Sequence, residues 1–399
     1  MSLLLILAVA FVASMFMAWT IGANSNSAPF APAVGANALP VMRAALFVGF
    51  FASAGAVLQG GSISETVGRE LIRGVAITPL AAATALLTAA ALITVGNRRG
   101  YPIPAAFTVT GAMIGVGLSL GGDPAIGKYT EIASFWLAIP VVAITIALAT
   151  ATILRRDEVP EYVSIPLLSG VVGFVVANMR ISLIPAPSGQ GALSGYVSRR
   201  IAVGGPSLGG VDAVVLLTSV ALGVVFALAM RWTFRRRSVE AGTRTFLVLL
   251  GSLVVFSSGG SQVGLATGPL ETLFDEQLGL PGSYLIALGG LAILVGGWTG
   301  SPRVVQAVSR EYSQLGERRS ISALVPAFII SQTAIALGLP VSTNETIISS
   351  LIGSGLVEGS AGVSSGKIGY TVAFWVLSLA SAAAIGFGGY RVLAAVFGA

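Results

Sequence analysis

Long apolar runs alternate with short polar segments along almost all of this 399-residue chain. Most runs are close to the roughly 20 residues that an α-helix needs to cross the hydrocarbon core of a bilayer. By this length criterion we count about twelve runs, around residues 2–21, 41–60, 74–96, 103–120, 132–154, 162–178, 211–230, 246–258, 283–299, 321–337, 341–357 and 370–398. The pattern predicts an all-α integral membrane protein that crosses the bilayer many times.

The pattern also occurs twice along the chain. The two lysines, Lys128 and Lys367, each follow a glycine and precede a Phe-Trp pair, at an offset of 239 residues. Other matches keep nearly this offset, namely residues 100–103 with 338–341 and residues 67–70 with 308–311. Such self-similarity at a fixed spacing indicates an internal duplication.

Seven predicted crossings separate the starts of the two copies, and an odd number inverts the second copy relative to the first. We therefore expect two inverted-topology repeats with broken or re-entrant helices near the midplane, as in many secondary transporters. Repeat one is expected over residues 1–154 and repeat two over residues 246–399. Residues 155–245 are expected to connect them through further spans, a polar external loop and a basic cytoplasmic loop.

Composition narrows the possible chemistry. Charged residues make up only 10% of the chain, against roughly 25% in soluble domains. The chain has neither cysteine nor histidine, which excludes disulfides, thiolate metal sites, histidine proton relays and Ser-His catalysis. Carboxylates remain as the groups that titrate near neutral pH. We therefore expect no enzyme activity, no resident metal and no other cofactor.

The cations indicate how the chain lies in the membrane. Assigning loops alternately to two sides places 15 of the 22 lysines and arginines on one side. The positive-inside rule makes that side cytoplasmic and leaves both termini external in a plasma-membrane protein. Because the cations sit in short loops between apolar spans, we expect the lipid bilayer and not nucleic acid as the partner of this charge. A homodimer is also expected to be possible.

Two matched stretches, 22–35 and 257–270, are too polar or too rich in glycine and proline for a lipid-facing helix. Backbone that leaves the helix at membrane depth must be satisfied by protein or by a water-filled cavity. Exposed helix ends there would offer N–H groups and a positive dipole end to an anion. The candidate anion ligands are the backbone groups of Gly22, Ala23, Gly259 and Gly260 and the side chains of Asn24, Ser25, Ser261 and Gln262.

A second matched pair of breaks lies at residues 101–110 and 339–346, and the later copy is the more polar one. Its candidate ligands are Ser342, Thr343, Asn344 and Thr346, with Thr108 in the earlier copy. Glu345 is an acid within an apolar run, which is costly and therefore indicates a function. A helix that begins near Ser342 would alternatively use Glu345 in a capping box. The two interpretations are compatible.

These segments resemble the PiT family of inorganic phosphate transporters. The resemblance rests on Gly22–Ser25 and on Gly259–Gln262, which are similar to the family's two Gly-Ala-Asn-Asp signatures, and on Gly338–Thr346, which is similar to its Pro-Val-Ser-Thr-Thr-His-Thr segment. It covers residues 22–150 and 250–399. It implies a symporter for phosphate, or sulfate in some members, that is driven by sodium or protons and contains two re-entrant hairpins.

The chain departs from the family pattern at several positions. Ser25 and Gln262 replace the two signature aspartates, and Glu345 stands where the family has histidine. Other differences are Ser261, Ala28 and Leu265 in place of asparagines and the segment 104–107, which has lost the Ser-Thr-Thr-His motif. A dry sodium site favours a carboxylate ligand, so the loss of both aspartates favours proton coupling. Glu345 is the candidate coupling residue, because burial favours the protonated form of a carboxyl group.

The predicted function is import of a small inorganic oxyanion by alternating access between the two repeats. Phosphate is the first choice from the family. Sulfate is the alternative, because an unprotonated dianion needs only the hydrogen-bond donors that these side chains supply. An uncoupled anion channel and a non-transporting membrane scaffold are the alternatives from other classes.

Overall fold

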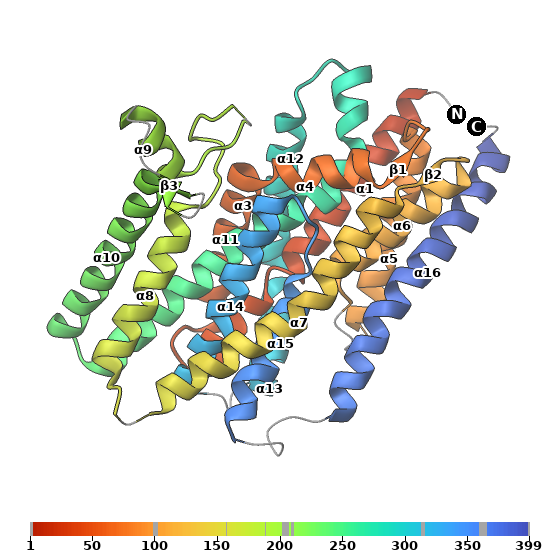
Figure 1. Ribbon diagram of the computed structural model, residues 1–399. Helices are drawn as coiled ribbons and strands as arrows, with labels where there is room; N and C mark the ends of the chain where they lie inside the picture. The colour runs from red at the N-terminus through yellow and green to blue at the C-terminus, as the bar shows by residue number, and fades with distance from the viewer. Residues whose placement is uncertain are drawn as a thin grey trace.

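The computed structural model describes residues 3–98, 103–156, 158–187, 189–201, 207–208, 211–312, 316–358 and 365–397, and nearly all of its elements are helices (Figure 1). Within this part of the chain, nine helices are long and apolar enough to cross a membrane. Three of the expected spans, at 103–120, 162–178 and 341–357, are shorter helices of 15, 17 and 13 residues. The multi-pass, all-α architecture is confirmed.

Among the described residues up to Arg155, the chain forms seven α-helices, two short helical turns and two short strands. They are α1 (Leu3–Ala23), η1 (Ala28–Phe30), α2 (Ala31–Gly35), α3 (Val41–Gln59), α4 (Gly61–Glu65), the π-helical turn η2 (Thr66–Glu70), β1 (Ile72–Arg73), α5 (Pro79–Arg98), α6 (Ala105–Ser119), β2 (Asp123–Pro124) and α7 (Ile126–Arg155). The antiparallel pair β1–β2 joins the segment before α5 to the segment after α6.

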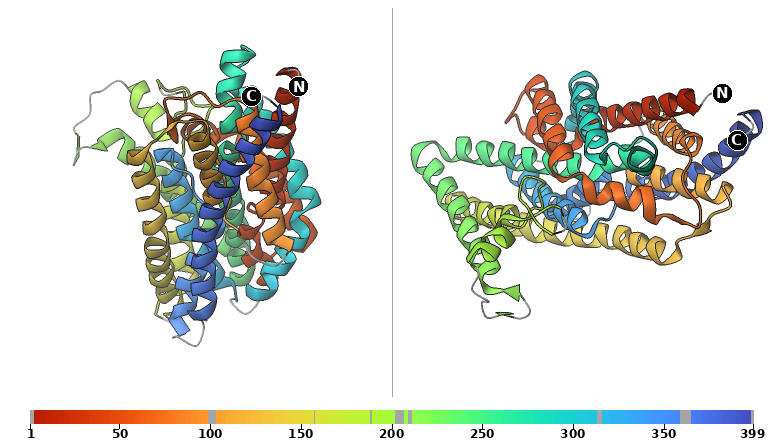
Figure 2. Two further views of the ribbon diagram at one scale, coloured as in Figure 1. Left: turned by 90° about the vertical axis from the view of Figure 1, so that its right-hand side faces the viewer. Right: turned by 90° about the horizontal axis from the view of Figure 1, so that it is seen from above.

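A flanking unit follows, made of α8 (Glu161–Ala177), α9 (Leu193–Ile201), the antiparallel pair β3 (Ser207–Leu208) and β4 (Val211–Asp212), and α10 (Ala213–Arg236). Helices α8 and α10 pack against each other along their length. Both views place this unit at one side of the bundle (Figures 1 and 2). It lies within the segment that the sequence assigns to the connection between the repeats.

The last part consists of α11 (Val239–Gln277), α12 (Gly282–Thr299), α13 (Ser301–Tyr312), α14 (Gly316–Leu337), α15 (Thr343–Gly355), η3 (Leu356–Glu358) and α16 (Ser365–Phe397). Figure 1 shows that α5 descends from the top of the view and α6 returns there, whereas α14 rises from the bottom and α15 returns to the bottom. The two hairpins therefore enter from opposite faces. Helices α7 and α16, which begin just before the two lysines, also start at opposite faces.

The packing repeats itself with the offsets found in the sequence. Helix α1 packs on α12 as α11 packs on α3, and α6 packs on α16 as α15 packs on α7. A Cβ added to Gly55 would overlap the Phe256 carbonyl oxygen, and one added to Gly296 would overlap the Trp19 carbonyl oxygen. Gly296 is the repeat counterpart of Gly55, and Trp19 is the repeat counterpart of Phe256. These equivalent contacts are what an inverted duplication produces.

One expectation is wrong. The stretch 257–270 is not a break, because α11 runs without interruption from Val239 to Gln277. Its glycines serve close helix packing instead: a Cβ on Gly259 would overlap the Ala52 carbonyl oxygen, and one on Gly260 would approach the Gln59 side chain. Small residues let helix backbones approach closely inside a membrane protein. The glycine content therefore reflects the contact with α3 and not an unwound backbone.

Candidate functional site

The first helix break lies where the sequence predicts it. Helix α1 ends at Ala23, residues 24–27 form turns, and the chain continues through the short helices η1 and α2. All residues from 22 to 33 are buried. The amide nitrogen atoms Nδ2 of Asn24 and Asn26 are buried and find no hydrogen-bond partner in the part of the chain that the structure describes. This turn therefore brings unpaired donors into the protein interior.

The later hairpin provides the second part of the site. Ser342 caps α15, because its Oγ accepts a hydrogen bond from the Glu345 backbone N–H at 3.4 Å. The predicted helix start is thus confirmed. Thr343 is the first helical residue, and residues 339–347 are all buried. The positive end of the α15 dipole and its free N–H groups therefore face the interior of the bundle.

Four buried polar side chains from three elements form a continuous hydrogen-bonded chain. Gln262 Nε2 lies 2.5 Å from Thr343 Oγ1, which lies 2.6 Å from Ser258 Oγ. Ser258 Oγ in turn lies 2.5 Å from Asn26 Oδ1. The chain joins the turn after α1 to α11 and to the first residue of α15. We refer to Asn26, Ser258, Thr343 and Gln262 as the polar chain.

Because each hydroxyl group has one proton to donate, the three hydrogen bonds of the polar chain must all run in the same direction. If Ser258 donates to Asn26 Oδ1, then Thr343 must donate to Ser258, and Gln262 Nε2 must donate to Thr343. This leaves Asn26 Nδ2 and Gln262 Oε1 unpaired among the described residues. Exchanging O and N in both amides reverses every bond, but one donor and one acceptor are left free in either case.

The other predicted side chains are buried but are not members of the polar chain. Thr108 and Thr346 donate to carbonyl oxygens one turn earlier in their own helices, at 2.8 and 3.1 Å. Ser261 donates to the Ser258 carbonyl oxygen at 3.1 Å. Ser25 and Asn344 are also buried, and each is the sequence neighbour of a member of the polar chain. The hydroxyl groups of Thr108, Thr346 and Ser261 therefore support local backbone.

The predicted backbone ligands have other roles. Gly22 and Ala23 are still helical, and a Cβ on Gly22 would overlap the Ile293 carbonyl oxygen. Gly259 and Gly260 lie inside α11, where the helix uses their backbone groups. These four positions therefore act through close packing. The expectation that Gly259 and Gly260 present free backbone groups is wrong for this reason.

Glu345 is 1% exposed, and its Oε2 atom has no hydrogen-bond partner among the described residues. It is the only acidic residue within α15. Elsewhere in the described ranges, no group of three or more acidic side chains is placed to hold a metal ion. Glu345 is therefore a buried carboxyl group close in sequence to the polar chain.

Asn26 and Ser258 belong to the polar chain but were not predicted as candidate ligands, although both lie within the stretches 22–35 and 257–270. Ser258 and Gln262 are four residues apart and share one face of α11. A helical interpretation of 257–270 would have identified this face. The amide pair of Gln59 and Gln332, which exchange hydrogen bonds of 3.1 Å, was not predicted either, since nothing in the sequence joins α3 to α14.

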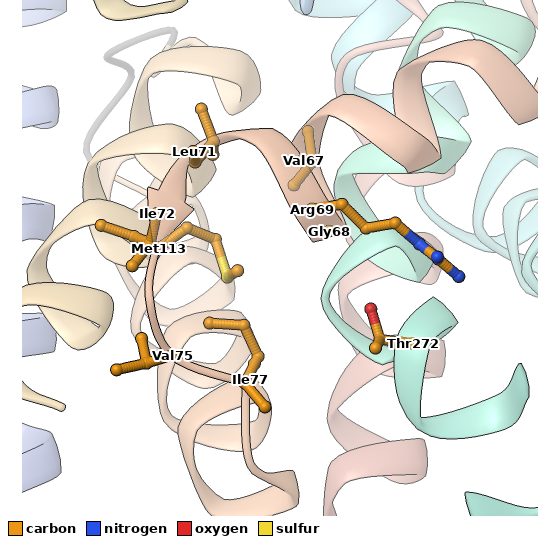
Figure 3. A pocket seen from close by; sticks show the side chains of 10 residues that line it. Val67, Gly68, Arg69, Leu71, Ile72, Val75, Ile77, Met113 and Thr272 are labelled. Atoms are coloured by element: carbon orange, nitrogen blue, oxygen red, sulfur yellow. The ribbon is translucent and has the colours of Figure 1, made fainter. Parts of the chain in front are cut away.

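A separate cavity of about 260 Å³ lies between η2, α6 and α11 (Figure 3). Its wall is mainly apolar, with Leu71, Ile72 and Met113 on one side, while the Arg69 side chain extends toward α11. None of the predicted site residues lines it. An oxyanion requires several donors, and Arg69 is already paired with Asp275 at 2.9 Å. We therefore assign the candidate site to the polar chain and not to this cavity.

Comparison with known proteins gives the family. The sequence profile described as "Phosphate transporter family" matches residues 21–386. The chain belongs to the phosphate transporter family. It is therefore a membrane transporter, and the expectation that it is not an enzyme is confirmed by this membership.

Two relatives match this chain over nearly their full length. Proteins of Pyrococcus abyssi and Chlamydia trachomatis, both provisionally named phosphate permeases, are 25% and 24% identical. The matches cover 92% and 98% of this chain and 93% and 99% of the two relatives. A solved structure described as "The sodium-dependent phosphate transporter" has a TM-score of 0.80 at 24% identity, with 97% of this chain and 98% of that chain covered. The fold is therefore shared with that transporter.

Proposed function

We propose that this transporter carries phosphate across the membrane by alternating access at the polar chain. The observation that carries the proposal is the convergence of Asn26, Ser258, Thr343 and Gln262 in the buried interior. These residues come from the turn after α1, from the middle of α11 and from the start of α15. A movement of one repeat against the other would therefore change the site directly, as alternating access requires.

The proton count of the site favours phosphate over sulfate. The polar chain leaves one amide donor and one amide acceptor free in either direction of its hydrogen bonds. Phosphate near neutral pH keeps at least one proton, so that it can donate to the acceptor as well as accept from the donor. Sulfate has no proton and would leave the buried acceptor unpaired, which costs about 1–3 kcal/mol. Family membership supports the same substrate.

The neutral character of the polar chain favours coupling to protons. None of its four members is a carboxylate, and sodium in a dry site prefers at least one such ligand. Glu345 lies two residues after Thr343 and is fully buried, and we propose that it takes up the coupling proton. Sodium remains the competing coupling ion, since the solved relative is described as sodium-dependent.

Uptake into proteoliposomes tests substrate and coupling together. Labelled phosphate and labelled sulfate would be offered separately under an imposed sodium gradient, an imposed proton gradient and no gradient. We expect saturable phosphate uptake that is stimulated by the proton gradient. Preferential sulfate uptake would refute the phosphate assignment, and stimulation by sodium alone would refute proton coupling. A linear, gradient-independent flux would indicate an uncoupled channel.

The role of Glu345 has its own test. The Glu345→Gln variant keeps a similar shape but cannot exchange a proton. We expect it to lose the acceleration by an imposed proton gradient while it retains phosphate counterflow, because counterflow needs no net proton movement. A normal response to the proton gradient in this variant would eliminate the coupling role.

The orientation proposed from the cations has both termini outside the plasma membrane. Figure 1 shows the N and C ends of the chain on one side of the bundle, which is compatible with that proposal. A tag on either terminus should be accessible to an impermeant reagent from outside intact cells. Accessibility only after permeabilisation would reverse the orientation.

A further inference from the structure

The tip between α14 and α15 is buried and not helical, so its backbone polar groups cannot be paired within a helix. Residues 339–342 are buried, and Gly338 turns the chain with a positive φ of 68°. Backbone carbonyl groups at such a position need partners from other elements. The partner of the Pro340 carbonyl oxygen is the indole Nε1 of Trp136, at 2.7 Å. Trp136 belongs to α7, on the other side of the duplication.

The indole ring of Trp136 is held from a second direction. It stacks on Phe107 with ring centroids 3.8 Å apart and an angle of 15° between the planes. Phe107 lies in the first turn of α6, the second helix of the earlier hairpin. Trp136 therefore links the start of α6 to the tip that precedes α15. Both aromatic side chains are buried.

Pro340 lies only three positions before Thr343, an inner member of the polar chain. Without the indole donor of Trp136, the buried Pro340 carbonyl oxygen would be left unpaired at the full cost of its desolvation. The tip would then relax toward another conformation. The position of the Thr343 hydroxyl relative to Ser258 and Gln262 would then change. We propose that Trp136 is a positioning residue, which fixes the tip of the later hairpin and thereby the geometry of the anion site. This inference rests on the proposed function.

The repeat counterpart of Trp136 provides a matched control. Trp375 is equally buried and also lies near Phe107, with ring centroids 6.3 Å apart. Its Nε1 atom, however, has no hydrogen-bond partner within the described ranges. Replacing either tryptophan by phenylalanine removes a similar volume. Only Trp136→Phe removes a hydrogen bond to the tip of the later hairpin.

The first measurement is phosphate uptake by Trp136→Phe and Trp375→Phe in proteoliposomes. We expect Trp136→Phe to raise the KM for phosphate about tenfold, with a smaller change in kcat, as the loss of one buried hydrogen bond implies. We expect Trp375→Phe to change KM by less than about twofold, since ring volume alone is altered. An unchanged KM in Trp136→Phe overturns the proposal.

The second measurement needs no substrate and separates the proposal from the function on which it rests. The chain has no cysteine, so Leu339→Cys introduces one reporter thiol at a buried position of the tip. In this background we expect Trp136→Phe to accelerate maleimide labelling about tenfold through more frequent local opening, and Trp375→Phe to leave it unchanged. Equal labelling of the two variants overturns the positioning role. Accelerated labelling without any phosphate transport by the parent protein would keep that role and refute the substrate.

Discussion

The two repeats are nearly identical in how their helices pack and different in how they present polar groups. Gly55 and Gly296 make the same backbone contact in the two copies, and Thr108 and Thr346 make the same hydrogen bond one turn back. At the starts of α6 and α15, in contrast, Ala105 in one copy corresponds to Thr343 in the other. Packing has kept the symmetry of the duplication, while three of the four members of the polar chain, Ser258, Gln262 and Thr343, come from repeat two.

The largest loss of stability is expected at the glycine contacts that the two repeats share. Gly55→Ala and Gly296→Ala each force a Cβ against a backbone carbonyl that cannot move away cheaply. We expect each to lower the free energy of unfolding by about 3 kcal/mol or more, because overpacking displaces two helices. Thermal unfolding in detergent measures this.

Gly388→Ala is the control, since no atom lies within 4 Å of an added Cβ at this position of α16. It should leave the melting temperature unchanged or raise it slightly. A large difference between Gly55→Ala and Gly296→Ala would contradict the equivalence of the two contacts.

The second prediction concerns the position where the repeats differ. Thr343→Val removes the hydroxyl that joins Gln262 to Ser258, so that two buried polar groups lose their partner. We expect kcat/KM for phosphate to fall about 10–100-fold, at roughly 1–3 kcal/mol for orphaned groups.

Thr108→Val and Thr346→Val serve as paired controls, because each loses only a hydrogen bond within its own helix. Both should retain kcat/KM within about threefold. Uptake by the three variants is compared at equal protein density in vesicles. The contrast between the repeats would fail if Thr108→Val were as defective as Thr343→Val.

The third prediction uses the buried amide pair of Gln59 and Gln332, which has no equivalent in the other repeat. The corresponding residues are Gly300 and Thr94, which cannot form such a pair. Gln332 also donates to Ser257 Oγ at 2.6 Å, and Gln59 donates to the Arg180 carbonyl oxygen at 2.9 Å. We expect Gln332→Leu to destabilise the protein by about 2 kcal/mol.

A double-mutant cycle with Gln59→Leu measures the coupling. We expect a coupling energy of about 1–2 kcal/mol, since each single variant leaves the other amide unpaired in the interior. Additive losses in unfolding free energy would mean that the two amides do not depend on each other.

The smallest change in stability is expected for the ion pairs of Lys128. Lys128 pairs with Glu70 at 2.8 Å and with Glu131 at 3.0 Å. Burial tends to raise the pKa of Glu70, but hydrogen bonds from Lys128 and Thr66 outweigh it and lower this pKa. A lowered carboxyl pKa stabilises the fold above the unfolded-state value and loses this contribution as the pH falls through the folded-state value.

Lys128→Met should therefore lower the free energy of unfolding by at most about 1 kcal/mol at pH 7, because both carboxylate partners are exposed to solvent. The difference from the parent protein should shrink in acid below pH ~4 and in high salt. Chemical denaturation over a pH series checks this. A difference that grows in acid would contradict the assignment to Glu70.

The apolar pattern determined much of this protein without any structure. Run length and the lack of charge predict the spans, and the matched lysines and Phe-Trp pairs predict the inverted duplication, because both are local or periodic properties of the chain. The cap at Ser342 was likewise predictable, since capping depends on neighbouring residues. The break between α14 and α15 was predicted at the correct place for the same reason.

Tertiary structure alone decided how the polar residues are used. The glycines of 257–270 suggested an unwound segment, but the contact between α11 and α3 requires them in a continuous helix. Asn26, Ser258 and Thr343 meet only because three elements cross at one point, and their hydrogen bonds span up to 232 residues of sequence. The packing of helices that are distant in the sequence decides which hydrogen-bond partner a buried polar group finds. No local pattern in the sequence encodes that packing.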